Sequence, residues 1–303
     1  MKKVLLFLTL LAFVSLKAQI VNIPDANFKA ILLAANTTNV IAKDATGNYM
    51  VIDANGDNEI QNSEAAAVYE LTILNSNISN LTGIEDFVNL TNLNCGLNGL
   101  TTLDISQNTN LIILDCHDNQ LTTLDVSQNT ELAVLRSGNN QLTTLDVSQN
   151  TSLTSLGCVV NELMTLDISQ NTSLLTLYCY GNQLTTLDVS QNTDLINLDC
   201  SNNQLTTLDV SQNTNLTQLT CSSNPNLGYI NLKNGNNDNF NASIYYSGFS
   251  NLPNLHNVCV DALNTDLTDF ITAQTGHAVT YSTDCSALSV LSNDAQLLLK
   301  FNL

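Results

Sequence analysis

The sequence predicts a mainly β solenoid of short parallel strands, with extended return segments and a small helical cap at the N-terminal end. Two observations predict this fold. Between Leu90 and Asn224 a motif of the form LTTLDVSQNTxLxxLxCxxNQ recurs seven times, every 21 residues, without slippage. Its LTTLDVS half is rich in Thr and lacks the helical spacing of apolar residues. A fixed period of this size indicates a solenoid, because each unit buries its apolar face only against its neighbours.

Residues 1–18 have the features of a secretory signal peptide. Lys2 and Lys3 precede an apolar run from Val4 to Leu16, and Ala18 is a small residue suited to cleavage. The run is too short to span a bilayer. We therefore expect a secreted protein, extracellular or at the cell surface, with the periplasm as the alternative. We expect no integral membrane segment.

The chain is strongly acidic, with a formal net charge of −19. Lys2, Lys3 and Lys17 lie in the signal segment, so five of the eight basic residues remain beside 27 acidic ones after cleavage. Nucleic acid and anionic lipid attract basic surfaces, and this composition argues against both as partners. Cations, basic partners and neutral glycans remain compatible with it, although solubility alone also explains an acidic surface.

Composition changes along the chain divide it into five parts. In the N-terminal cap, Asp25 is suited to cap a helix that carries Phe28, Ile31 and Leu32 on one face. The tail after the C-terminal cap is a short separate piece, which we interpret as the remnant of a sorting segment. The predicted parts are a signal peptide (1–18), an N-terminal cap (19–67), a solenoid (68–232), a C-terminal cap (233–285) and the tail (286–303).

Six cysteines recur at one position of the repeat, and alternation along a strand points them inward. A spacing of 21 residues differs from the CxxC spacing of metal sites, so we expect free thiols packed as small hydrophobic residues. Cys259 and Cys285 lie outside this ladder, and in an exported protein they are predicted to form a disulfide. The ladder consists of Cys95, Cys116, Cys158, Cys179, Cys200 and Cys221, with Ser137 in the remaining repeat.

A second ladder consists of aspartates in the LTTLDVS segment. Calcium held between successive rungs is one interpretation of these carboxylates. Solvated acids tied to their local backbone are the interpretation that we favour, because the Gly-rich nonapeptide of calcium-binding β-rolls is absent. The ladder consists of Asp104, Asp125, Asp146, Asp167, Asp188 and Asp209.

The repeat resembles the 21-residue leucine-rich repeats of secreted bacterial proteins. Residues Leu111 to Asn119, LIILDCHDN, fit the pattern LxxLxCxxN, and the second half of each unit fits LxxLDxS. The resemblance implies parallel strands that line one concave side of a narrow coil, with extended return segments. It also implies that the Asn of each unit turns inward and hydrogen-bonds the backbone of the turn.

Residues 53–64, DANGDNEIQNSE, resemble an EF-hand calcium loop. Position 6 of the loop is Asn58 where EF-hands have Gly, but Asn tolerates the left-handed conformation required there. The resemblance predicts one structural Ca²⁺ site before the repeats, and an Asp/Asn-rich turn without a metal is the alternative. The predicted ligands are Asp53, Asn55, Asp57, Glu59 through its carbonyl, and Glu64 as the bidentate carboxylate.

The x positions of LxxLxCxxN point to solvent and vary, while LTTLDVSQNT is nearly constant. Arg136 is the only arginine, and we expect it to pair with Asp115 on the previous rung. Tyr178 and Tyr180 lie near small residues and predict an aromatic platform for a peptide or sugar. Drift in a tolerant array is the alternative. The candidate ligand-binding residues are Asp115, His117, Arg136, Tyr178, Tyr180 and Asp199.

Catalysis is not expected. No nucleophile stands beside His117 on the exposed face, and the chain lacks the GxSxG, HExxH, P-loop and GxGxxG motifs. We therefore predict a monomeric, non-enzymatic module that binds a protein or a glycan with its concave face. The alternatives are a structural spacer or adhesin stalk, and ice binding by the Thr-bearing return face.

Overall fold

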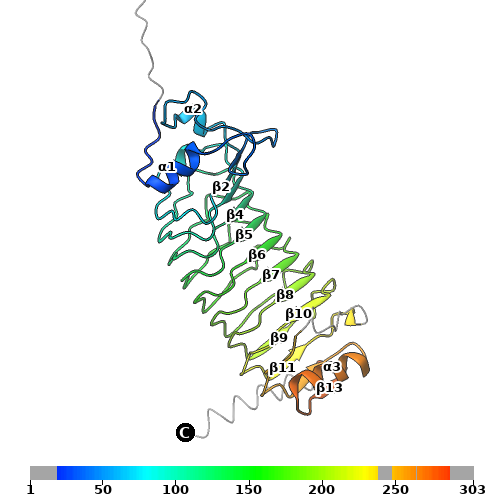
Figure 1. Cartoon of the computed structure of the whole chain (residues 1–303). Helices are drawn as coiled ribbons and strands as arrows, with labels where there is room; N and C mark the ends of the chain where they lie inside the picture. Colours follow the sequence, from blue (N-terminus) through cyan, green and yellow to red (C-terminus); the bar gives the residue numbers. More distant parts are fainter. Residues whose placement is uncertain (1–18, 238–247, 264, 287–303) are drawn as a thin grey trace, which may run out of the picture.

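The protein is a long stack of rungs with a cap at each end (Figure 1). This computed structural model describes residues 19–237, 248–263 and 265–286. The predicted signal peptide and the tail from residue 287 onward lie outside the described residues. Within the described ranges no helix has the length and apolar character needed to cross a membrane.

The N-terminal cap closes the first rung with helices and a short antiparallel strand pair. Helix α1 (Ala26–Leu33) begins where Asp25 accepts hydrogen bonds from the backbone N–H groups of Asn27 and Phe28, as the sequence predicts. Phe28 and Leu32 are fully buried. The remaining elements are β1 (Ala42–Lys43), which pairs antiparallel with β2 (Glu70–Thr72), helix α2 (Asn62–Ala65) and the 3-10 turn η1 (Ile84–Asp86).

The described residues place β1 and eight parallel strands in one nine-stranded sheet along the stack. In each repeat strand the middle Leu points into the core, and the residues on either side point outward. We call this outward side, predicted as the concave side, the strand face. The eight strands are β2, β3 (Asn92–Asn94), β4 (Ile113–Asp115), β5 (Val134–Arg136), β6 (Ser155–Gly157), β7 (Thr176–Tyr178), β8 (Asn197–Asp199) and β10 (Gln218–Thr220).

The LTTLDVS segments form the opposite side of the stack, which we call the return face. On most rungs these segments are neither helix nor paired strand, which agrees with the predicted extended return. Near the C-terminal end they become a second parallel sheet, so the stacking continues past residue 232 into the predicted C-terminal cap. The elements are β9 (Thr207–Asp209), β11 (Tyr229–Asn231), β12 (Asn257–Cys259) and β13 (Thr280–Ser282), with helix α3 (Thr265–Thr275) beside them (Figure 1).

The core is a set of residue columns that run the length of the stack. The Leu residues of each LxxLxC segment are buried, and the six ladder cysteines are fully buried free thiols. Burial raises the pKa of the Cys116 and Cys158 thiols to about 12. Cys259 and Cys285 form a disulfide with their Cα atoms 5.5 Å apart. The ladder thiols therefore pack in the core as small hydrophobic side chains, as expected from their spacing.

Each rung is tied to its neighbour by a buried carboxamide, as the resemblance implied. In one example the side-chain oxygen of Asn140 accepts a hydrogen bond from the backbone N–H of Leu121 at 2.9 Å. Its amide nitrogen donates to the carbonyls of Cys116 and Ser137, both at 3.1 Å. One side chain thus satisfies backbone groups of two rungs at a tight bend.

A second buried Asn ladder, which the sequence analysis did not identify, lies in the SQNT segment. Asn129, for example, is fully buried and donates to the carbonyls of Ile105 and Asn108 at 3.0 and 2.9 Å. Asn150 repeats this geometry one rung later. The invariance of this Asn in the motif was the signal available in the sequence.

Ser137 occupies the Cys position of β5's rung and generates a stability prediction. Its hydroxyl is fully buried and has no hydrogen-bond partner among the described residues. A buried polar group without a partner destabilises the folded state by about 1–3 kcal/mol. Ser137→Cys should therefore raise the free energy of unfolding by about 1 kcal/mol or more, measured by urea denaturation under reducing conditions. Cys158→Ser is the matched control and should lower it, and an unchanged midpoint for both variants would contradict the argument.

Candidate functional site

The six residues predicted to bind a ligand lie on the strand face or at its edge. Strand register aligns one outward residue from each of β4 to β8 into a single line, which we call the central column. Its members are Asp115, Arg136, Gly157, Tyr178 and Asp199. Adjacent members are one strand spacing apart, about 4.8 Å. His117 and Tyr180 follow two residues after Asp115 and Tyr178, and by alternation they emerge on the same side.

Asp115 is the anchor of a small polar network at the N-terminal end of the column. Its side chain is only 11% exposed, although the sequence predicted a solvent-facing residue. Its Oδ1 is hydrogen-bonded to Nδ1 of His117, and its Oδ2 lies 3.7 Å from a guanidinium nitrogen of Arg136. The structure thus contains the expected Arg136–Asp115 pair. His117 and Arg136 together cover the carboxylate, which explains its burial.

Glycines between the larger side chains shape this surface. A Cβ at Gly96 would lie 2.5 Å from the His117 ring, so the imidazole rests against the backbone of the preceding rung. At Gly157 the situation is the opposite, because an added Cβ would meet only one atom within 4 Å, the carbonyl oxygen of Leu135 at 3.9 Å. Gly157 therefore leaves a gap in the central column, because no side chain stands between Arg136 and Tyr178.

Four exposed apolar side chains lie in the next two rungs, those of β7 and β8. Tyr178 and Tyr180 are 40% and 37% exposed, so both rings present a large area to solvent. Leu175 and Ile196, which immediately follow the first Leu of their repeats, are 40% and 39% exposed. These four side chains, which we call the tyrosine patch, occupy two neighbouring rungs. Large apolar side chains exposed on neighbouring rungs are typical of binding surfaces.

Asp199 borders the tyrosine patch and is held by its own turn. Its Oδ1 accepts hydrogen bonds from the backbone N–H and the hydroxyl of Ser201, at 3.0 and 2.6 Å. Among the ion pairs of the described residues none involves Asp199. Its carboxylate is therefore oriented but lacks a cationic neighbour within the described chain.

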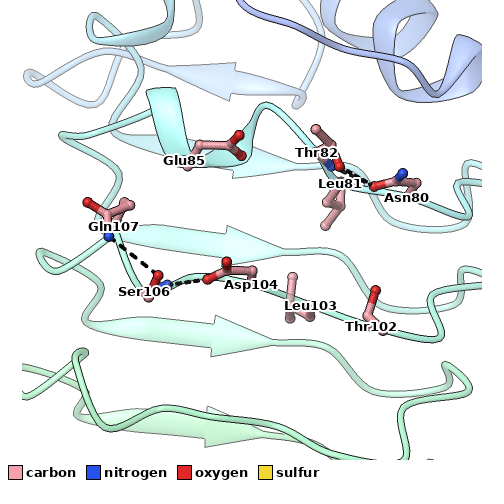
Figure 2. Close-up of a pocket in the computed structure, with 9 residues that line it drawn as sticks. All are labelled: Asn80, Leu81, Thr82, Glu85, Thr102, Leu103, Asp104, Ser106 and Gln107. Atoms are coloured by element: carbon pink, nitrogen blue, oxygen red, sulfur yellow. Dashed lines mark hydrogen bonds between the residues drawn. The ribbon is translucent and has the colours of Figure 1, made fainter.

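The return face carries polar clefts between rungs. Figure 2 shows one of them, in which Thr82 and Asn80 from one rung face Thr102, Asp104 and Ser106 from the next. Similar clefts recur around Asp146 and Asp188. The Asp side chains of this face accept a hydrogen bond from the Ser N–H two residues later, for example at 2.9 Å in Asp125.

This bond is the main reason that the pKa of the Asp125 carboxyl lies below its usual value, and the neighbouring Asp104 and Asp146 oppose the shift only weakly. The acids of the ladder are thus tied to their local turns, which is the interpretation favoured from the sequence. Exposed Asp beside exposed Thr also means that the return face is not a uniform Thr array.

The predicted calcium ligands share one loop whose chain path fits the resemblance. The carboxylate of Asp53 accepts hydrogen bonds from the backbone N–H groups of Gly56, Asp57 and Asn58, at 2.9 to 3.2 Å. Asn58 has φ +65°, the left-handed conformation expected at position 6. Glu64 lies in the first turn of α2. The backbone of the loop therefore curls around the Asp53 carboxylate.

The side chains of the loop form hydrogen bonds within the loop. Asp57 accepts from the amide nitrogen of Gln61 at 3.0 Å, and Glu64 accepts from the backbone N–H groups of Ala54 and Gln61. A hydrogen bond from the Glu59 N–H is the largest factor that lowers the pKa of Asp57. In residues 19–237, 248–263 and 265–286, no three His, Cys, Asp or Glu side chains are grouped as a metal would require. Calcium binding would need Gln61 and Glu64 to reorient.

Two features of the strand face were missed from the sequence. One is the burial of Asp115, which depends on His117 in the same rung and Arg136 in the next rung. The other is Leu175 and Ile196, whose signal was available, because they occupy an outward x position that holds Thr or Ala in every other repeat except that of Ile112.

Solved structures share this architecture. The functional domain of InlJ from Listeria monocytogenes, described as including a cysteine ladder, is 33% identical with a TM-score of 0.52. The alignment covers 87% of this chain but only 60% of that domain. Internalin C2 from Listeria monocytogenes is 17% identical with a TM-score of 0.50, over 78% of this chain and 93% of its own. No protein-family model matches the chain, and no curated protein matches its sequence.

The fold is a leucine-rich repeat solenoid. The predicted fold class is therefore confirmed. The cysteine ladder described for the InlJ domain also has a counterpart in the six stacked thiols of this chain. What the strand face binds does not follow from this likeness.

The Asp115 network predicts unequal effects of its two side-chain partners. His117→Ala should lower the free energy of unfolding by about 1–2 kcal/mol, because it removes the side-chain hydrogen bond of a nearly buried carboxylate. Arg136→Ala should lower it by less than about 1 kcal/mol, since the Arg136 side chain is 56% exposed. Urea denaturation measures both. In an Asp115→Asn background the His117→Ala effect should shrink, and equal effects in both backgrounds would refute the network.

Proposed function

We propose that this protein is an exported, non-enzymatic binding module that recognises a partner protein with its strand face. The observation that carries the proposal is the tyrosine patch. Its four large apolar side chains, in the rungs of β7 and β8, are each 37% to 40% exposed. Tyrosine supplies much contact area at a small loss of side-chain freedom, which suits a binding hot spot.

The repeat architecture supports a binding role over a purely structural spacer. The buried positions of every rung are nearly constant, whereas the central column changes from charged to small to aromatic over five strands. A spacer needs only the constant positions. Residues 1–18, with their basic start and apolar run, support export.

Replacing the two exposed tyrosines tests the binding face. The variant Tyr178→Ala/Tyr180→Ala should lose most capture of proteins from the surface fraction of candidate partner cells, because both rings are removed from the patch. Capture is measured by affinity pull-down with the signal-free protein, followed by quantitative mass spectrometry.

The matched control is Thr122→Ala/Thr143→Ala, which alters two exposed side chains of the return face. It should retain the wild-type set of captured proteins. An identical set for the wild type and the tyrosine variant would refute binding by this patch and favour the spacer.

We also propose one structural Ca²⁺ site in the loop of residues 53–64. The spacing of Asp53, Asn55, Asp57 and Glu64, and the curl of the backbone around Asp53, support it. When bound, the cation would supply a fixed positive centre to a loop that lies directly before α2 and the first parallel rung. Its role would be to stiffen this cap. A lone loop of this kind is expected to bind Ca²⁺ with a Kd of about 10⁻⁴ to 10⁻³ M.

Glu64→Gln tests the calcium site while preserving an acceptor for the backbone of α2. The wild-type melting temperature should rise by several degrees in ~10 mM CaCl₂ relative to EGTA, because binding to the folded state stabilises it by mass action. Glu64→Gln should abolish that rise, since the bidentate carboxylate is lost. Thermal melts followed by circular dichroism measure both.

Glu59→Gln is the matched control, because Glu59 is expected to ligate through its carbonyl while its side chain pairs with Lys29. It should lower the melting temperature slightly but retain the calcium response. A response that persists in Glu64→Gln, or a wild type without one, would refute the site.

A further inference from the structure

We propose that Asp199 and Tyr178 form a receptor for an arginine side chain of the partner protein. The inference rests on the proposed function, because it identifies what the strand face takes from its partner. Three features carry it. Asp115, the equivalent of Asp199 in an earlier rung, is paired with an arginine of this chain. Asp199 has no such cation among the described residues. An aromatic ring, that of Tyr178, flanks Asp199.

The chain itself shows what this carboxylate position can hold. Asp115 and Asp199 occupy the same place in their repeats, and each accepts a hydrogen bond from the backbone N–H two residues later, at 3.3 and 3.0 Å. On the next strand, Arg136 is registered opposite Asp115 and reaches its Oδ2. An arginine one rung away is therefore a fitting occupant of this site.

Asp199 lacks that neighbour. The residue registered opposite it on β10 is Thr220, and the position of His117 is taken by Ser201. Both replacements are neutral, so the carboxylate is oriented by hydrogen bonds without being neutralised. The difference in burial agrees with this, because Asp115 is buried whereas Asp199 is only half-buried. Among the described residues, neither Thr220 nor Ser201 supplies a cation at the place that Arg136 takes at Asp115.

Tyr178 supplies the second contact. It is registered opposite Asp199 on the preceding strand, so the two side chains rise from positions about 4.8 Å apart. A guanidinium bound to Asp199 would come within the roughly 6 Å range over which a cation is attracted to a tyrosine ring. Gly157 on the far side of Tyr178 leaves the approach to that ring open. Carboxylate and ring together favour a flat cation over a simple point charge.

Charge complementarity also favours a basic partner. The chain carries 27 acidic and only eight basic residues, and three of the basic ones lie in the signal segment. The only arginine is already paired with Asp115. An acidic surface of this kind attracts basic proteins over long range and repels acidic ones.

Filling the site from within the chain tests the inference most sharply. Thr220→Arg places an arginine one rung after Asp199, as Arg136 follows Asp115, without removing any residue of the receptor. Asp199→Asn removes the charge and keeps the shape. The probe is N-acetyl-arginine amide, compared with N-acetyl-lysine amide. Binding is followed by shifts of the backbone amide resonances of Tyr178 and Ser201 in two-dimensional NMR spectra.

The arginine probe should shift both resonances in the wild type and bind more tightly than the lysine probe. Asp199→Asn and Thr220→Arg should each weaken binding by about tenfold or more, because a hydrogen bond to a charged group is lost or occupied. Gln141→Arg, an equal change of charge at an exposed residue in another rung, should leave binding unchanged. Equal binding of both probes, or unchanged binding by Asp199→Asn, would overturn the receptor.

The capture experiment separates this inference from the proposed function. Thr220→Arg should also lose the proteins whose capture requires Tyr178 and Tyr180. If it retains them, arginine is not what the partner presents, and the inference fails while the binding face stands. If the arginine probe binds but capture does not depend on the tyrosines, the proposed binding face is wrong instead.

Discussion

The inward carboxamide of each rung is the constraint on which the rest of this structure depends. Strands of three residues cannot satisfy the backbone of the bends that follow them. A side chain such as Asn140 does so by bonding the Leu121 N–H and carbonyls of two rungs at once. Because the bonds run between rungs, a copy of the repeat is stable only beside another copy. The caps at the two ends follow from that requirement.

This constraint divides the positions of the repeat into two kinds, buried and outward. Leu, Cys and both Asn positions lie inside and are nearly constant, because a change there leaves a cavity or an unpaired polar group in two neighbouring rungs. Ser137 departs from the Cys of its position, and its hydroxyl, like the Oδ1 atoms of the SQNT asparagines, has no hydrogen-bond partner among the described residues. The outward positions have no such restriction. Chemistry on the strand face can therefore change from rung to rung while the fold does not.

The same division explains how much the sequence could predict. Period and residue type were enough for the solenoid and the free thiols, and the resemblance to leucine-rich repeats added the inward Asn and the extended return. Each of these depends on contacts repeated at a fixed spacing. The burial of Asp115 was not predictable in this way, since it depends on two different side chains, His117 two residues later in the same rung and Arg136 on the next rung. The loop at Asp53 is a third case. Its chain path followed from the motif, but the hydrogen bond from Gln61 to Asp57 did not.

The central column shows how an array of equal sites acquires specificity. Asp115 and Asp199 occupy the same place in their repeats, and what differs is the side chains around them, both two residues later and one rung away. Where the neighbour is Arg136 the carboxylate becomes part of the scaffold. Where the neighbours are Thr220 and Tyr178 it stays oriented, half-buried and without a cation of its own among the described residues. In a solenoid, then, a binding position requires no new backbone geometry. When one rung lacks the side chain that pairs with a repeated residue elsewhere, that residue is left to pair with a partner.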